Sequence, residues 1–121
     1  MTYETESEIA KVLQDFESCT TDKGEFRHRE HLTVAVCYLQ NSTVEVAAEK
    51  MRNALLRFLD HHQVDRQKYS ETITIFWLES VARELTKLSG WSLVEQCNVV
   101  IDSLGDSNSL GVKEPRNRRN P

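Results

Sequence analysis

The sequence has few cysteines, and they are not arranged as pairs. Cys19, Cys37 and Cys97 are odd in number and widely spaced, and none belongs to a C-x-x-C motif. Neither a disulfide framework nor a thiolate zinc site is therefore indicated. Cys37 and Cys97 fall within helical patterns, where we expect each thiol to behave as a small buried hydrophobic side chain.

Long apolar runs and nucleotide-binding motifs are also missing. No apolar run approaches the about 20 residues that cross a membrane, and the first residues are acidic and polar, unlike a signal or transit peptide. We therefore expect a cytoplasmic protein that has no membrane partner. The sequence has no glycine-rich phosphate loop and no dinucleotide motif, so it does not support nucleotide-dependent chemistry. It also has no nucleophile triad, so it does not support acyl transfer by serine or cysteine.

Positive charge is scarce over most of the chain. The 121 residues are 39% hydrophobic and 28% charged, which is typical of one globular domain with a buried core. The net charge of −4 is uneven, with −6 in residues 1–105 and +2 in residues 106–121. Because nucleic-acid binding depends on basic surfaces, we expect no nucleic-acid partner.

Helical periodicity runs through the first 105 residues. Apolar side chains recur at i, i+3, i+4 and i+7, the spacing of one buried helix face. Five segments have this period, and we expect helices at about residues 5–18, 27–40, 43–62, 69–88 and 92–103. Capping boxes are expected at Thr5–Glu8, Ser42–Glu45 and Ser92–Glu95, and Gly90 is expected to end the fourth helix.

These elements predict an all-α fold, a bundle of four to five helices joined by short loops. We expect a helical bundle domain at residues 1–105 and an irregular or disordered basic tail at residues 106–121. The 69–88 segment has the widest apolar arc, so it is expected at the centre of the bundle. Leu78 and Val81 lie at one edge of that arc, where an exposed apolar strip would favour a homodimer.

Two histidines near the start of the second helix are candidate metal ligands. His28 and His31 are one turn apart on the same helix, so both imidazoles could bind one ion. Glu71, which opens the fourth helix, would complete a set of two histidines and one carboxylate. The metal hypothesis therefore names His28, His31 and Glu71 as the ligands of a divalent ion.

The second functional hypothesis is a small-molecule pocket between the second and fourth helices. Its expected lining is His28, His31, Tyr69, Glu71 and Thr72. In this hypothesis the imidazoles bind the ligand or act as acid and base, Tyr69 donates a hydrogen bond, and Thr72 or Thr74 orients the ligand. A structural alternative stays open, because polar side chains are common at helix starts, where backbone N–H groups need partners.

Other polar and aromatic residues have less specific expectations. His62 falls on the apolar face of the third helix, where it would either add a third imidazole or cap the last carbonyl groups. His61 is expected to be exposed. Trp77 and Trp91 are expected in the core rather than in a binding site.

The motifs at the two helix starts resemble those of a family of small, uncharacterised, all-helical bacterial proteins. That family has F-x-H-x-x-H before a leucine-rich helix and Y-H-E-T-x-T at the start of another. The matching segments here are Phe26-Arg27-His28-Arg29-Glu30-His31 and Tyr69-Ser70-Glu71-Thr72-Ile73-Thr74. The resemblance covers roughly residues 26–80 and implies no particular activity. Ser70 replaces the family's histidine, so a ligand set of three histidines and a glutamate would lose one member here.

Overall fold

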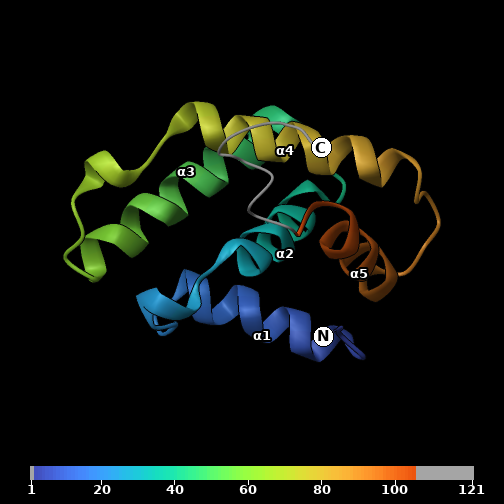
Figure 1. The fold of residues 1–121 in the computed structure, drawn as a ribbon, viewed down its shortest axis with the longest axis horizontal. Coiled ribbons are helices and arrows are strands. Elements are labelled where there is room, and N and C mark those ends of the chain that lie inside the picture. Colours follow the sequence, from blue (N-terminus) through green and yellow to red (C-terminus); the bar gives the residue numbers. More distant parts are fainter. Residues whose placement is uncertain (1, 106–121) are drawn as a thin grey trace, which may run out of the picture.

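Five α-helices make up the computed structural model, which describes residues 2–105 (Figure 1). They are α1 (Glu6–Glu17), α2 (His28–Leu39), α3 (Val44–His61), α4 (Glu71–Thr86) and α5 (Leu93–Leu104), with short 3-10 helices η1 (Lys23–Glu25) and η2 (Arg66–Lys68). The predicted all-α class is confirmed, and residues 2–105 contain no strand. In that range no helix has both the length and the hydropathy to cross a membrane. The predicted basic tail, residues 106–121, lies outside the described residues.

The central helix is α2, which packs against each of the other four. Seven of its twelve residues are buried. The prediction that the fourth helix is central was wrong, because α4 leaves Ile73 and Phe76 54% and 50% exposed. Leu78 and Val81, predicted at the edge of an exposed strip, are instead 1% and 0% exposed. Their side chains face the bundle, so they cannot belong to a surface for a second copy.

The helix starts follow the local sequence closely. Two of the three predicted capping boxes are present, Thr5–Glu8 and Ser92–Glu95. At α3 the cap is Thr43 rather than Ser42, and the Thr43 hydroxyl accepts a hydrogen bond from the Val46 N–H. Ser70 caps α4 by accepting from the Ile73 N–H. Each cap supplies a partner for an N–H group that the helix itself leaves unpaired.

Three helices are followed by a residue in the left-handed backbone region. These residues are Cys19, Asn41 and Gln63, with φ angles of 63°, 55° and 59°. After α3 the Val64 N–H donates to the carbonyl oxygen of Leu59 at 2.8 Å, which folds Val64 back over the last turn of the helix. Gly90 also has a positive φ, 87°, but it lies beyond the end of α4 at Thr86 rather than directly after it.

A cluster of three phenylalanines lies beneath the start of α2. Phe16 and Phe26 stack with their ring centroids 4.1 Å apart, and Phe58 lies 5.4 Å from Phe16 and 5.3 Å from Phe26. The cluster joins α1, the segment before α2, and α3. Aromatic pairs of this kind contribute about 0.5–1.5 kcal/mol each beyond the area that they bury. Phe26 is therefore held in a fixed position, directly before the histidines of α2.

Candidate functional site

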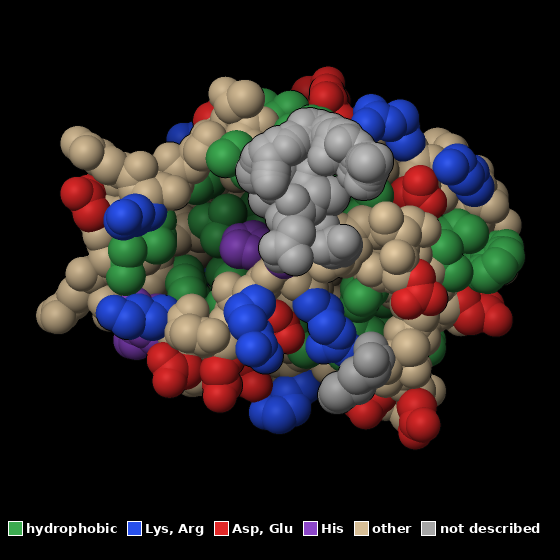
Figure 2. Space-filling model, viewed as in Figure 1, with side chains coloured by type: hydrophobic (Ala, Val, Ile, Leu, Met, Phe, Trp, Pro, Cys, Tyr) green, Lys and Arg blue, Asp and Glu red, His purple; other side chains and the backbone are tan. Residues whose placement is uncertain are grey.

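A cavity of about 270 Å³ opens between the start of α2, α3 and the first half of α4. Most of its lining is aliphatic or aromatic and includes Phe26, Met51 and Trp77. The polar side chains of the lining are those of Arg27, His28, His31 and Thr74. Figure 2 shows a hollow on this face in which a histidine lies among hydrophobic side chains. We call it the α2–α4 cavity.

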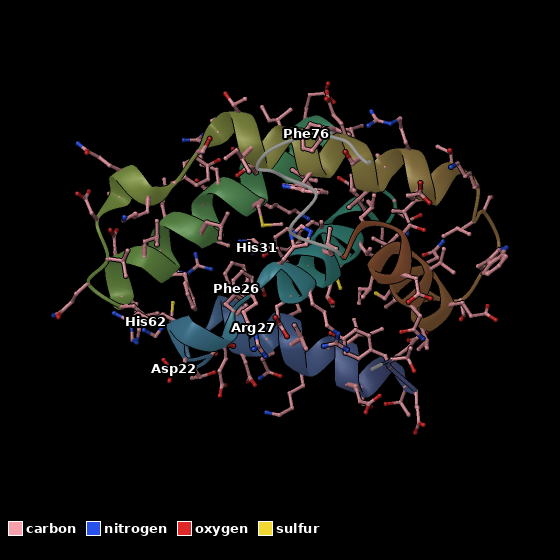
Figure 3. The ribbon with its side chains drawn as sticks, viewed as in Figure 1. Asp22, Phe26, Arg27, His31, His62 and Phe76 are labelled. Atoms are coloured by element: carbon pink, nitrogen blue, oxygen red, sulfur yellow. The ribbon has the colours of Figure 1, made fainter. Side chains whose placement is uncertain are left out.

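His31 supplies an uncharged imidazole to this lining. Its ring meets that of Phe26 edge-on, with centroids 4.4 Å apart, and the two side chains lie together in Figure 3. The pKa of His31 is lowered from 6.5 to about 4, mainly because the side chain is buried. A hydrogen bond to the Arg27 backbone opposes this shift, and neighbouring His28 adds to it. At neutral pH His31 therefore offers hydrogen bonds without a charge.

His28 is bound at one end to another helix. Its Nε2 atom lies 2.8 Å from the carbonyl oxygen of Leu104, and because a carbonyl can only accept, Nε2 donates this bond. The His28 ring also meets that of Trp77 edge-on, with centroids 4.6 Å apart. His28 thus lines the cavity while it joins the start of α2 to the end of α5.

A chain of polar side chains leads from the cavity to the surface. The Tyr69 hydroxyl donates to Oε1 of Glu71 at 2.6 Å, and that carboxylate lies 3.9 Å from Nε of Arg52. Burial and the bond to Glu71 raise the pKa of Tyr69 to about 12, although a hydrogen bond from Thr74 opposes the shift. Thr74 itself lines the α2–α4 cavity. These polar side chains therefore form a path from the cavity to solvent, in the order Thr74, Tyr69, Glu71 and Arg52.

The predicted site residues are not all brought to one place. His28 and His31 line the α2–α4 cavity, and Tyr69 lines an adjacent cavity that shares His31. Glu71 and Thr72 are exposed and line neither. Within residues 2–105 no group of three or more histidine, cysteine or carboxylate side chains is arranged to hold a metal ion. His28, His31 and Glu71 are therefore not assembled as the predicted ligand set, since Glu71 faces Tyr69 and Arg52 instead.

The remaining candidates lie away from the cavity. His62 is the C-cap of α3, its ring lies 4.4 Å from Phe58, and it lines neither cavity. Its Nε2 atom is buried without a hydrogen-bond partner among residues 2–105. His61 is exposed, as predicted. Trp91 is 48% exposed, so its predicted place in the core was wrong.

Several residues of the cavity were not predicted as site residues. Trp77 was expected in the core, but it is half-buried and lines the cavity together with Leu78 and with Thr74, which was predicted to orient a ligand. These three positions are spaced i, i+3 and i+4, so they share one face of α4, and this spacing could have grouped them. Met51 of α3 carries no comparable local signal, because it reaches the cavity through the packing of separate helices.

Comparison with known proteins finds no matching family model, no matching curated protein and no matching solved structure. The resemblance to small helical bacterial proteins rests on the two helix-start motifs and stays a prediction. The shape and chemistry of the cavity are therefore the basis for a functional proposal.

Proposed function

We propose that the α2–α4 cavity binds a small, uncharged, mostly apolar molecule. The observation that carries this proposal is the neutral His31 within an otherwise largely apolar lining. Arg27 is the one charged side chain among the described residues of the lining, and it is exposed. A charged ligand would lose its hydration in this cavity without gaining a buried counter-charge.

The size and shape of the cavity favour a ring compound. An apolar cavity of about 150 Å³ is large enough for benzene, so the about 270 Å³ of this cavity has room for a larger ring system. Phe26 and Trp77 present aromatic faces and edges to the ligand, which suits an aromatic partner.

The hydrogen bonds already made in the cavity indicate what the ligand must supply. The ring N–H of His31 is engaged with the Arg27 backbone, which leaves the other ring nitrogen as an acceptor. The Thr74 hydroxyl is engaged as a donor to Tyr69, which leaves its oxygen as an acceptor. A ligand that carries an N–H or O–H donor therefore fits better than one that carries acceptors alone.

The test compares indole, which has an N–H donor, with benzothiophene, which has the same shape and no such donor. Titration calorimetry should show that indole binds more tightly to the wild-type protein. Thr74→Val keeps the shape of the side chain and should weaken indole binding about fivefold, since a hydrogen bond of this kind contributes about 1 kcal/mol. Binding of benzothiophene should not change.

Thr72→Val is the matched control, because Thr72 lies on the same helix but is exposed and outside the cavity. It should leave both affinities unchanged. Failure of both compounds to bind at millimolar concentration would rule out the proposed function. Equal losses in the two threonine variants would rule out the role of Thr74.

A second candidate function, self-association, is favoured by the outer face of α4. Ile73 and Phe76 are about half exposed and lie one turn apart on α4, and adjacent apolar side chains on a surface favour a protein contact. We propose that two copies pack through this face, so that sedimentation shows a dimer that Phe76→Ser dissociates. Trp91→Ser is the control, since Trp91 is equally exposed but lies between α4 and α5. A wild-type monomer at millimolar concentration would exclude this candidate.

A further inference from the structure

A second cavity, of about 330 Å³, lies on the other side of Phe26 and His31, which line both cavities. Its remaining lining comes from the last turns of α3, from the turn that follows, from η1 and η2, and from the residue directly after η2. These residues are Leu55, Phe58, Leu59, Val64, Lys23, Lys68 and Tyr69. We call it the α3–η2 cavity.

The inner surface of this cavity is apolar and firmly packed. Phe58 is 5% exposed and belongs to the cluster formed with Phe16 and Phe26. Val64 is held over Leu59 by the hydrogen bond that ends α3. An apolar group placed here would cover side chains that are already fixed, so little ordering would oppose its binding.

The rim carries two positive charges. Lys23 lies in η1 and Lys68 in η2, both are exposed, and no acidic side chain is among the described residues that line the cavity. Within residues 2–105 neither lysine forms an ion pair, whereas nearby Arg66 is paired with Asp60 at 3.1 Å. Figure 2 shows apolar side chains at this end of the molecule with basic ones on either side of them.

We propose that the α3–η2 cavity binds an anionic amphiphile, a carboxylate with an aliphatic chain. The chain lies against Leu55, Leu59 and Val64, and the carboxylate lies between Lys23 and Lys68 at the rim. The uncharged His31 closes the inner end, so the charged group of the ligand is placed outward. This site goes beyond the proposed function, because its ligand is charged and its anchoring residues differ.

The two parts of the ligand contribute differently to affinity. Each methylene that becomes buried should tighten binding by about fourfold until the cavity is full. An exposed ammonium contributes less, about two- to fivefold for each lysine, and this contribution falls as salt is added. The aliphatic chain therefore supplies most of the affinity, and the lysines supply the preference for a carboxylate over a neutral head group.

The experiment compares octanoate, hexanoate and octanol by titration calorimetry against the full chain. Octanoate should bind the wild-type protein about tenfold more tightly than octanol and at least tenfold more tightly than hexanoate. In the Lys23→Met/Lys68→Met double variant the preference for octanoate over octanol should disappear. Lys87→Met is the matched control, because Lys87 is exposed and lines neither cavity, and it should leave the preference intact.

A cavity-filling variant locates the site. Val64→Trp should abolish octanoate binding while indole binding persists. Equal affinities of octanoate and octanol for the wild type, or unchanged octanoate binding in Val64→Trp, would overturn this inference. Indole is titrated into the same samples, so failure of indole with success of octanoate would overturn the proposed function alone.

Discussion

The Nε2 atom of His28 lies 2.8 Å from the carbonyl oxygen of Leu104, and this bond joins the first residue of α2 to the last residue of α5. The same ring meets Trp77 of α4 at 4.6 Å. One imidazole thus links three helices at the edge of the α2–α4 cavity. For His28 the structural interpretation of the histidine pair has direct geometric support from this bond and this ring contact.

Replacement of His28 should therefore cost stability. His28→Ala removes the bond to Leu104 and the contact with Trp77, and we expect the free energy of unfolding to fall by about 1–3 kcal/mol. Urea denaturation measures the change. His61→Ala is the control, since His61 is exposed, and it should change the free energy by less than about 0.5 kcal/mol. Similar small effects in both variants would contradict the structural role of His28.

His31 should make the protein less stable in acid. Its pKa is about 4 in the folded protein and 6.5 when exposed, so between these values the unfolded chain binds a proton that the folded chain does not. The free energy of unfolding should therefore fall as the pH falls from 6.5 to about 4, by about 3 kcal/mol in all, and this contribution should level off below that pH.

Urea denaturation of His31→Gln across this range isolates the effect from that of the carboxylates. The variant should lose less stability than the wild type between pH 6.5 and 4. His61→Gln should follow the wild-type profile. Parallel profiles for His31→Gln and the wild type would mean that His31 titrates normally in the folded protein.

Gln63 is in a backbone conformation that suits glycine better. Its φ of 59° follows the end of α3, a position where a side chain crowds the backbone and where glycine is common. Gln63→Gly should raise the free energy of unfolding by about 0.5–1 kcal/mol, measured in urea. Gln63→Ala should not raise the free energy of unfolding, because alanine also has a Cβ atom. If Gln63→Ala stabilises the protein as much as Gln63→Gly does, the positive φ angle is not the cause of the gain.

Two thiols should be unreactive in the folded protein. Burial raises the pKa of Cys37 to about 11 and that of Cys97 to about 12, and the thiolate is the reactive form. An aromatic disulfide reagent at pH 8 should modify buried Cys97 only as fast as the protein unfolds and partly exposed Cys37 slowly, and it should modify both rapidly in denaturant. Fast labelling of the native protein that disappears in Cys37→Ala or Cys97→Ala would contradict this prediction.

The helix boundaries could be read from the sequence because their signals are local. Thr5 and Ser92 cap helices through residues three positions away, and such contacts require no knowledge of the rest of the fold. The error at α3 has the same origin. Ser42 and Thr43 are adjacent and chemically alike, and the periodicity cannot separate starts that differ by one residue.

The central helix and the full lining of the cavity could not be read in this way. Ile73 and Phe76 look like core residues on a helical wheel, but whether another helix covers that side of α4 depends on tertiary packing. Glu71 opens α4, as predicted, yet its carboxylate binds Tyr69 and faces Arg52 of α3. The rotation of one helix relative to another decides such contacts, and a single sequence does not specify it.

The central position of α2 has a consequence for hydrogen exchange. Its amide groups are covered by α1, α3, α4 and α5, so no single neighbouring helix can open and expose all of them to solvent. Exchange at Val34, Ala35 and Val36 should require unfolding of the whole domain. The exchange rates of these three amides therefore report the global free energy of unfolding, against which local openings at the two cavities can be measured.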